Sequence, residues 1–172
     1  YIHPTGNRLC VEVYKRSSAA WLEDQDFFSF SGIFRSVYLY AKTRCYLEDL
    51  WLDAGLAPDN RTGQLRLRLK FAETAVPNVH LFLSHPEDGD VFDSELPLKE
   101  SGGYYWSREL LLPGIRKWDH DHPELYRAVL AMEDGSCAAC SIGFRRFEIR
   151  DKLMLLNGER LMLNGVNRHE WS

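Results

Sequence analysis

The sequence lacks a long apolar run and a strong excess of either charge. No apolar stretch approaches the roughly 20 residues that a membrane-spanning helix needs, and the first residues do not resemble a signal peptide. The formal net charge is -4 over 172 residues, which leaves no basic patch of the kind that binds nucleic acid. We therefore expect neither a membrane nor a nucleic-acid partner.

Cysteine is also scarce, and its spacing is uninformative. The four cysteines are Cys10, Cys45, Cys137 and Cys140. Only the last two are close, and neither a second pair nor a histidine at ligand spacing accompanies them, as a zinc site would require. We expect unpaired thiols, which are usual in a reducing compartment, and hence a cytoplasmic protein.

Alternation of apolar and polar residues dominates what the sequence does contain. Leu65, Leu67 and Leu69 alternate with Arg66 and Arg68, a pattern typical of a half-buried antiparallel strand. Other segments repeat the pattern: residues 79–83, 104–112, 126–132, and 140–144 running on to 149. Turn residues separate them.

About seven short strands with such turns predict an immunoglobulin-like β-sandwich over residues 43–147. Tyr126 opens the penultimate strand and is placed to serve as a tyrosine corner. The chain is long enough to bury roughly two-thirds of its unfolded surface, so this core needs no disulfide.

The two flanks do not fit this sandwich. Residues 1–42 contain alternating runs at 9–13 and 34–40, which we interpret as the last strands of a preceding β domain. Residues 151–168 predict a hairpin with strands at 153–156 and 161–166, joined by Asn157-Gly158, the strongest short hairpin signal. The second strand leads into Asn167, Arg168, His169 and Glu170. Polar groups at a strand's carboxyl end are where (β/α) barrels place their chemistry.

Two motifs resemble a known family. Trp21-Leu22-Glu23-Asp24-Gln25-Asp26, continued by Ser31-Gly32-Ile33-Phe34-Arg35, resembles the end of the sugar-binding jelly-roll domain of bacterial β-galactosidases in glycoside hydrolase family two. Leu156-Asn157-Gly158, continued by Gly165-Val166-Asn167-Arg168-His169-Glu170, resembles the entry into that family's catalytic (β/α)8 barrel. Between them, Pro123-Glu124-Leu125-Tyr126 and Ile142-Gly143-Phe144-Arg145 are similar to its linking immunoglobulin-like domain.

The resemblance implies an all-β chain in three parts. Residues 1–42 would be the C-terminal part of the jelly roll, residues 43–147 the immunoglobulin-like β-sandwich, and residues 148–172 the first hairpin and strand of the barrel. The sandwich would then space and orient the sugar-binding and catalytic domains.

The resemblance also assigns substrate contacts to Asp26 and His169. Asp26 matches the carboxylate that reaches the galactose and helps to ligate a sodium ion, a role that suits an oxygen ligand. Composition alone favours a solvated acidic loop as the explanation of Glu23, Asp24 and Asp26, and the match to the family reverses that preference. His169 matches the barrel histidine that hydrogen-bonds the substrate and stabilises its transition state, whereas a packed or capping histidine is the alternative without the motif.

The neighbouring polar residues are expected to be structural. Arg35 would brace the loop that carries Asp26, while Asn167, Arg168 and Glu170 would hold the rim of the barrel through ion pairs and backbone contacts. Many relatives have further histidines after His-Glu, whereas this chain has Trp171 and Ser172. The resemblance therefore does not assign the residues that line this part of the sugar pocket.

The catalytic groups are expected elsewhere. Members of the family are retaining glycosidases that use two glutamates, and the resemblance places both, with the magnesium ligands, on barrel strands beyond Ser172. The parent protein would therefore hydrolyse a terminal β-galactoside with sodium and magnesium bound, whereas this chain alone would be inactive and bind neither ion. The resemblance leaves open whether the parent protein is a homo-oligomer.

Two other functions are compatible with parts of the sequence. A stand-alone carbohydrate-binding or adhesive sandwich is compatible with the fold, because sandwiches host many functions. The Asn157-Gly158 hairpin argues against it, since exposed strand edges without a partner favour aggregation. A β-glucuronidase or β-mannosidase of the same family would share the order of domains, but the Glu-Asp-Gln-Asp run at residues 23–26 favours a galactosidase.

Overall fold

The chain divides into two compact units in the computed structural model, which describes residues 3–18, 22, 31–73 and 78–167. One unit comprises Tyr1–Tyr40 with Gly165–Ser172, and the other comprises Ala41–Asn164. The described residues of the first unit form no strand, and their side chains are exposed. The strands predicted at 9–13 and 34–40 are therefore not formed, because no described segment of this unit pairs with their backbone groups.

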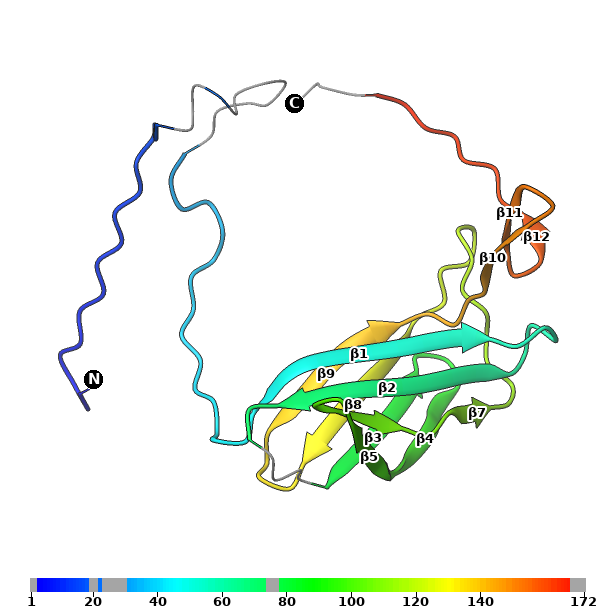
Figure 1. Ribbon diagram of the computed structural model, residues 1–172, viewed down its shortest axis with the longest axis horizontal. Coiled ribbons are helices and arrows are strands. Elements are labelled where there is room, and N and C mark those ends of the chain that lie inside the picture. Colours follow the sequence, from blue (N-terminus) through cyan, green and yellow to red (C-terminus); the bar gives the residue numbers. More distant parts are fainter. Residues whose placement is uncertain (1–2, 19–21, 23–30, 74–77, 168–172) are drawn as a thin grey trace. The chain divides into compact units, whose positions relative to one another are not determined.

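Two antiparallel sheets form the larger part of the second unit (Figure 1). In the first sheet the strand order is β1-β2-β6-β5, and β7 pairs with β2 beside β6. The five strands of this sheet are β1 (Leu47–Leu56), β2 (Gly63–Phe71), β5 (Leu98–Ser101), β6 (Tyr104–Ser107) and β7 (Leu110–Leu112).

The second sheet has the order β4-β3-β8-β9. Its strands are β3 (Val79–His85), β4 (Gly89–Glu95), β8 (Tyr126–Met132) and β9 (Cys137–Ile142). The predicted alternation at 65–71, 79–83 and 126–132 is confirmed, since every second residue in these ranges is apolar and buried and the residues between them are more exposed.

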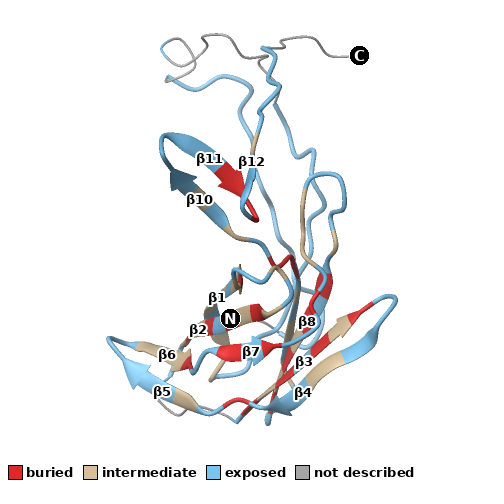
Figure 2. Cartoon of the chain, turned by 90° about the vertical axis from the view of Figure 1, so that its right-hand side faces the viewer, coloured by how far each residue is buried: buried red, intermediate tan, exposed pale blue. Residues whose placement is uncertain are grey.

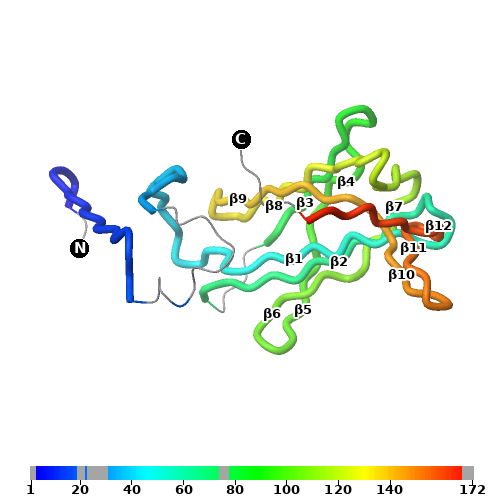
Figure 3. Tube along the Cα trace, turned by 90° about the horizontal axis from the view of Figure 1, so that it is seen from above, coloured from blue at the N-terminus to red at the C-terminus, as the bar shows by residue number. Residues whose placement is uncertain are grey.

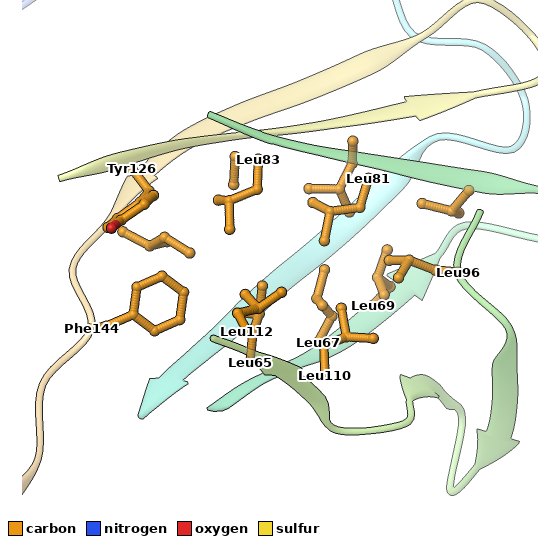
Figure 4. Close-up of a cluster of buried hydrophobic side chains, with 14 of the residues drawn as sticks. Leu65, Leu67, Leu69, Leu81, Leu83, Leu96, Leu110, Leu112, Tyr126 and Phe144 are labelled. Atoms are coloured by element: carbon orange, nitrogen blue, oxygen red, sulfur yellow. The ribbon is translucent and has the colours of Figure 1, made fainter. Parts of the chain in front are cut away.

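The core lies between the two sheets. Leucines of β2 and β7 face leucines of β3, and Tyr126 and Phe144 close one end of the cluster (Figure 4). Phe144 is fully buried although it belongs to no strand, and its ring lies edge-on to Tyr126 with centroids 5.2 Å apart. A Cβ on Gly63 would lie 2.9 Å from Phe144, so only glycine fits there without a shift.

Tyr126 forms the expected tyrosine corner. Its hydroxyl accepts a hydrogen bond from the backbone N–H of Arg116 at 2.8 Å. This bond ties the start of β8 to the long connection that precedes it, as in other immunoglobulin-like sandwiches. We call β1–β9 the sandwich.

A third, small sheet follows the sandwich, with the order β10-β11-β12. Its strands are β10 (Phe147–Arg150), β11 (Leu153–Leu156) and β12 (Glu159–Arg160), and we call it the hairpin sheet. It lies at the end of the sandwich nearest β7 (Figure 3). Most of its side chains are exposed, apart from the end of β11 (Figure 2).

The hairpin sheet corrects two predictions. The run from Cys140 to Ile149 is not one strand, because β9 ends at Ile142 and β10 pairs with β11 instead. The second hairpin strand is Glu159–Arg160, and the predicted strand at 161–166 is absent although Leu161 still donates to the carbonyl of Met154 at 2.8 Å. The Asn157-Gly158 turn is confirmed, with φ of 56° and 90°.

Candidate functional site

The two substrate contacts suggested by sequence, Asp26 and His169, lie outside the described residues, as do Arg168 and Glu170. Their roles therefore stay predictions. Of the other residues named with them, Arg35 has its guanidinium 5.8 Å from the Phe34 ring centroid, and Asn167 is exposed.

Other predictions concern metal, thiol and membrane chemistry. Within residues 3–18, 22, 31–73 and 78–167, no group of three or more His, Cys, Asp or Glu side chains is arranged to hold a metal ion. All four cysteines are free thiols, as expected. Over the same residues, no helix has the length and apolar character required to span a bilayer.

A densely hydrogen-bonded polar cluster joins the hairpin sheet to the sandwich. Asn157 stands at its centre and is only 3% exposed. Its backbone N–H donates to the carbonyl of Arg146 at 2.8 Å, and its Oδ1 accepts the N–H of Arg146 at 2.9 Å. These two reciprocal bonds close the turn against the segment that leaves the sandwich.

Two longer-range bonds use the remaining groups of Asn157. Its Nδ2 donates to the carbonyl of Trp118 at 2.9 Å, and its own carbonyl accepts Nδ2 of Asn60 at 3.0 Å. A buried amide with all of its groups satisfied is a stabilising feature, whereas the loss of one partner leaves a desolvated group unpaired. We call Asn60, Trp118, Arg146 and Asn157 the junction.

Arg146 supplies the charge of the junction. Its Nη1 donates to the carbonyls of Leu56 and Ala57 at 3.1 and 2.7 Å, where β1 ends. Its Nε donates to Glu148 Oε2 at 3.0 Å, and this bond is the main reason why the pKa of Glu148 lies below its usual value. One guanidinium therefore connects the β1–β2 turn with strand β10.

The loop around Trp118 forms the other wall of the junction. The Trp118 N–H donates to the Phe144 carbonyl at 2.8 Å, and its ring lies so close to Gly143 that a Cβ there would meet it at 2.8 Å. A cleft between this loop and the hairpin sheet is lined by Lys117, Asp119, His122 and Glu159 among others. Lys117 Nζ lies 3.9 Å from Glu159 Oε1, which adds a weak ionic link.

A second polar network supports the same loop. His85 is buried, its Nε2 lies 3.0 Å from Glu124 Oε2, and its ring lies against Tyr126. Arg116 makes a two-pronged contact with Asp88 at 2.8 and 3.0 Å, which holds the pKa of Asp88 below its usual range. Burial raises the pKa of Tyr126, so its hydroxyl stays protonated at neutral pH.

Comparison with known proteins identifies the family. Residues 1–43 match the sugar binding domain of glycosyl hydrolases family 2, and residues 147–172 match the TIM barrel domain of the same family. The chain is 43% identical to the β-galactosidase large subunit of Latilactobacillus sakei, over 99% of this chain and 27% of that protein. It is 38% identical to the β-galactosidase of Clostridium acetobutylicum, over 100% of this chain and 19% of that protein.

The chain belongs to glycosyl hydrolases family 2. Solved structures agree with this assignment at the level of the fold. The apo structure of Bacteroides uniformis β-glucuronidase 3 aligns with a TM-score of 0.65 at 24% identity, over 84% of this chain and 18% of that one. The β-glucuronidase of Parabacteroides merdae aligns with a TM-score of 0.60 at 25% identity, over 73% of this chain and 17% of that one.

One of the two family 2 matches begins at the junction. The TIM barrel match begins at residue 147, directly after Arg146 and at the first residue of β10. The junction therefore ties the sandwich to the part of the chain that resembles a barrel entry. Sequence reasoning had identified Asn157 only as a turn residue and had not singled out Arg146 or Trp118, because their bonds join segments 39 to 90 positions apart.

Proposed function

We propose that this chain is the central part of a longer retaining β-galactosidase, which hydrolyses terminal β-D-galactosyl residues. One observation carries the proposal. Relatives that are 34–43% identical to this chain over nearly its whole length bear the name β-galactosidase. Because the chain spans 27% of the first of these relatives and 19% of another, the activity is assigned to the longer protein and not to these 172 residues.

In this proposal the chain positions the site and supplies two contacts to it. Asp26 accepts hydrogen bonds from the sugar and is one oxygen ligand of a sodium ion, while His169 hydrogen-bonds the substrate as charge develops. The two catalytic glutamates and the magnesium ligands belong to the barrel beyond residue 172. The isolated chain would consequently bind sugar weakly and hydrolyse nothing.

The exposed surface of the hairpin sheet supports the presence of a further domain. Ile149 is 72% exposed, Phe147 is 53% exposed, and Met154, which pairs with Ile149, is 39% exposed. Apolar side chains gathered on one small sheet usually mark a surface that another part of the protein covers. A barrel that begins at this sheet would cover it, whereas a stand-alone binding module would leave it in water.

Substrate comparison in the full-length protein tests the proposal. We expect hydrolysis of nitrophenyl β-D-galactoside with kcat/KM at least about a hundredfold above that for the β-D-glucuronide and the β-D-mannoside, since a site built around one hydroxyl pattern rejects sugars that leave its polar groups unpaired. The first product should retain the β configuration by NMR. Preferential cleavage of the glucuronide or the mannoside would overturn the galactosidase assignment.

Substitutions test the two contacts separately. Asp26→Ala and His169→Ala should each lower kcat/KM by about a hundredfold or more, the usual cost of losing one substrate or transition-state partner. Asp24→Ala is the matched control for Asp26→Ala, because it removes a carboxylate from the same acidic run and should retain activity. Near-normal turnover of Asp26→Ala or His169→Ala would remove that residue from the site.

A further inference from the structure

The hairpin sheet shares no strand pairing with either sheet of the sandwich. Only Arg145 and Arg146 separate the buried Phe144 from the first residue of β10. The hydrogen bonds that fix the angle of the hairpin sheet are concentrated at Asn157 and Arg146. Its orientation therefore depends on a few directional bonds, together with the burial of Leu155 and Leu156 at the end of β11.

Asn157 performs two tasks that can be separated. The turn itself needs positive φ at 157 and 158, and Asp-Gly satisfies this requirement as well as Asn-Gly. The bond between Oδ1 and the Arg146 N–H is local and needs only an acceptor. The bond from Nδ2 to the Trp118 carbonyl needs a donor and reaches 39 positions back, so it contributes to orientation and not to the turn.

We propose that Asn157, through its Nδ2, is a positioning residue for the glycosidase site, a role that rests on the proposed function. His169 follows the turn shortly afterwards in the sequence, within the segment matched to the TIM barrel domain. In the full-length protein, a hairpin sheet that tilts on the sandwich would carry with it the segment that leads on to His169. Because misplacement of a reacting group by about 1 Å costs about a hundredfold in rate, the junction controls turnover although it contacts no substrate.

Asn157→Asp in the full-length protein isolates this role. The substitution keeps the turn and the acceptor for Arg146 N–H, but it places a carboxylate oxygen against the Trp118 carbonyl. We expect kcat for nitrophenyl β-D-galactoside to fall about tenfold to a hundredfold, with KM changed less than about threefold. A loss confined to folding would lower the amount of active enzyme, measured by active-site titration, and leave kcat per site unchanged.

Asn78→Asp is the matched control. Asn78 also donates its Nδ2 to an oxygen, Glu133 Oε1 at 2.9 Å, so the same chemical change breaks one bond there. That bond is exposed and links the loops beside β3 and β8, away from the hairpin sheet. We expect wild-type kcat from this variant, and an equal loss in both variants would overturn the positioning role.

A second measurement does not depend on activity. In the 172-residue chain, hydrogen exchange should show weaker protection of β10–β12 in Asn157→Asp than in the wild type, with the protection of residues 65–71 unchanged. Unchanged protection of the hairpin sheet would overturn the proposal. If the full-length protein cleaves another β-glycoside, the galactosidase assignment fails, and the kcat comparison made with that glycoside still decides the role of Asn157.

Discussion

Strands β2 and β10 have the same alternating sequence pattern, but the apolar face of β2 is buried and that of β10 is exposed. In β2, Leu65, Leu67 and Leu69 alternate with basic residues and are fully buried. In β10, Phe147 and Ile149 alternate with Glu148 and Arg150, yet Ile149 is 72% exposed. Alternation thus identifies a strand and its apolar face, but a second layer must be present before that face becomes a core.

The largest expected effect on stability is at Leu67 in β2. Leu67→Ala should lower the free energy of unfolding of the 172-residue chain by about 2–5 kcal/mol, because it leaves a cavity between the sheets. Ile149→Ala should change it by less than about 0.5 kcal/mol, since the side chain already contacts water. Urea unfolding measures both, and similar losses would mean that β10 is covered within this chain.

The next largest effect on stability is expected from adding a methyl group at Gly63, with Gly165 as the comparison. Gly63→Ala places a methyl group 2.9 Å from Phe144 and Ile115, and the overpacking should cost about 1–3 kcal/mol. At Gly165 nothing lies within 4 Å of the added Cβ, so Gly165→Ala should be close to neutral. Equal urea midpoints for the two variants would show that the end of the core near Phe144 yields easily.

Removal of one buried hydroxyl should lower the free energy of unfolding by a smaller amount. Tyr126→Phe removes the acceptor of the Arg116 N–H and should cost about 1–2 kcal/mol. Tyr38→Phe, at a position that is 79% exposed, should have no measurable effect on the unfolding midpoint. If both variants unfold like the wild type, the tyrosine corner contributes nothing to the stability of this sandwich.

The smallest effect concerns pH. Asp59 accepts hydrogen bonds from the hydroxyl of Thr62 and the N–H groups of Arg61 and Thr62, which lower its pKa from 3.8 to about 2. A carboxyl with a depressed folded pKa stabilises the fold above its unfolded pKa and loses this contribution as the pH falls from about 4 to about 2. Asp59→Asn should therefore unfold with a shallower pH dependence than the wild type in that window, and an identical dependence would exclude the contribution.

Much of the sandwich was predictable from local patterns. Strands at 65–71, 79–83 and 126–132, the tyrosine corner and the Asn157-Gly158 turn follow from period-two alternation and turn chemistry. The flanking strands at 9–13 and 34–40 did not form, because a strand needs a paired neighbour that its own sequence does not reveal. The break at Gly143–Arg146 was missed because it depends on Trp118 and Asn157, which approach only after folding.

The candidate site was predictable only in part. The family resemblance and the roles of Asp26 and His169 came from motifs, and the family is confirmed while the roles stay predictions. The junction was not anticipated, because hydrogen bonds between Arg146 and the end of β1 join residues about 90 positions apart. Such bonds leave no periodic signal in a single sequence.

The bonding of Asn157 has a chemical consequence as well as a mechanical one. In a flexible peptide, asparagine followed by glycine deamidates readily, because the next backbone nitrogen attacks the side-chain carbonyl and ammonia is lost. Here the Asn157 side-chain amide accepts a hydrogen bond from the Arg146 N–H and donates one to the Trp118 carbonyl. These two bonds restrict its rotation toward the backbone nitrogen of Gly158. The contacts that close the turn and orient the hairpin sheet should therefore also protect Asn157 against deamidation.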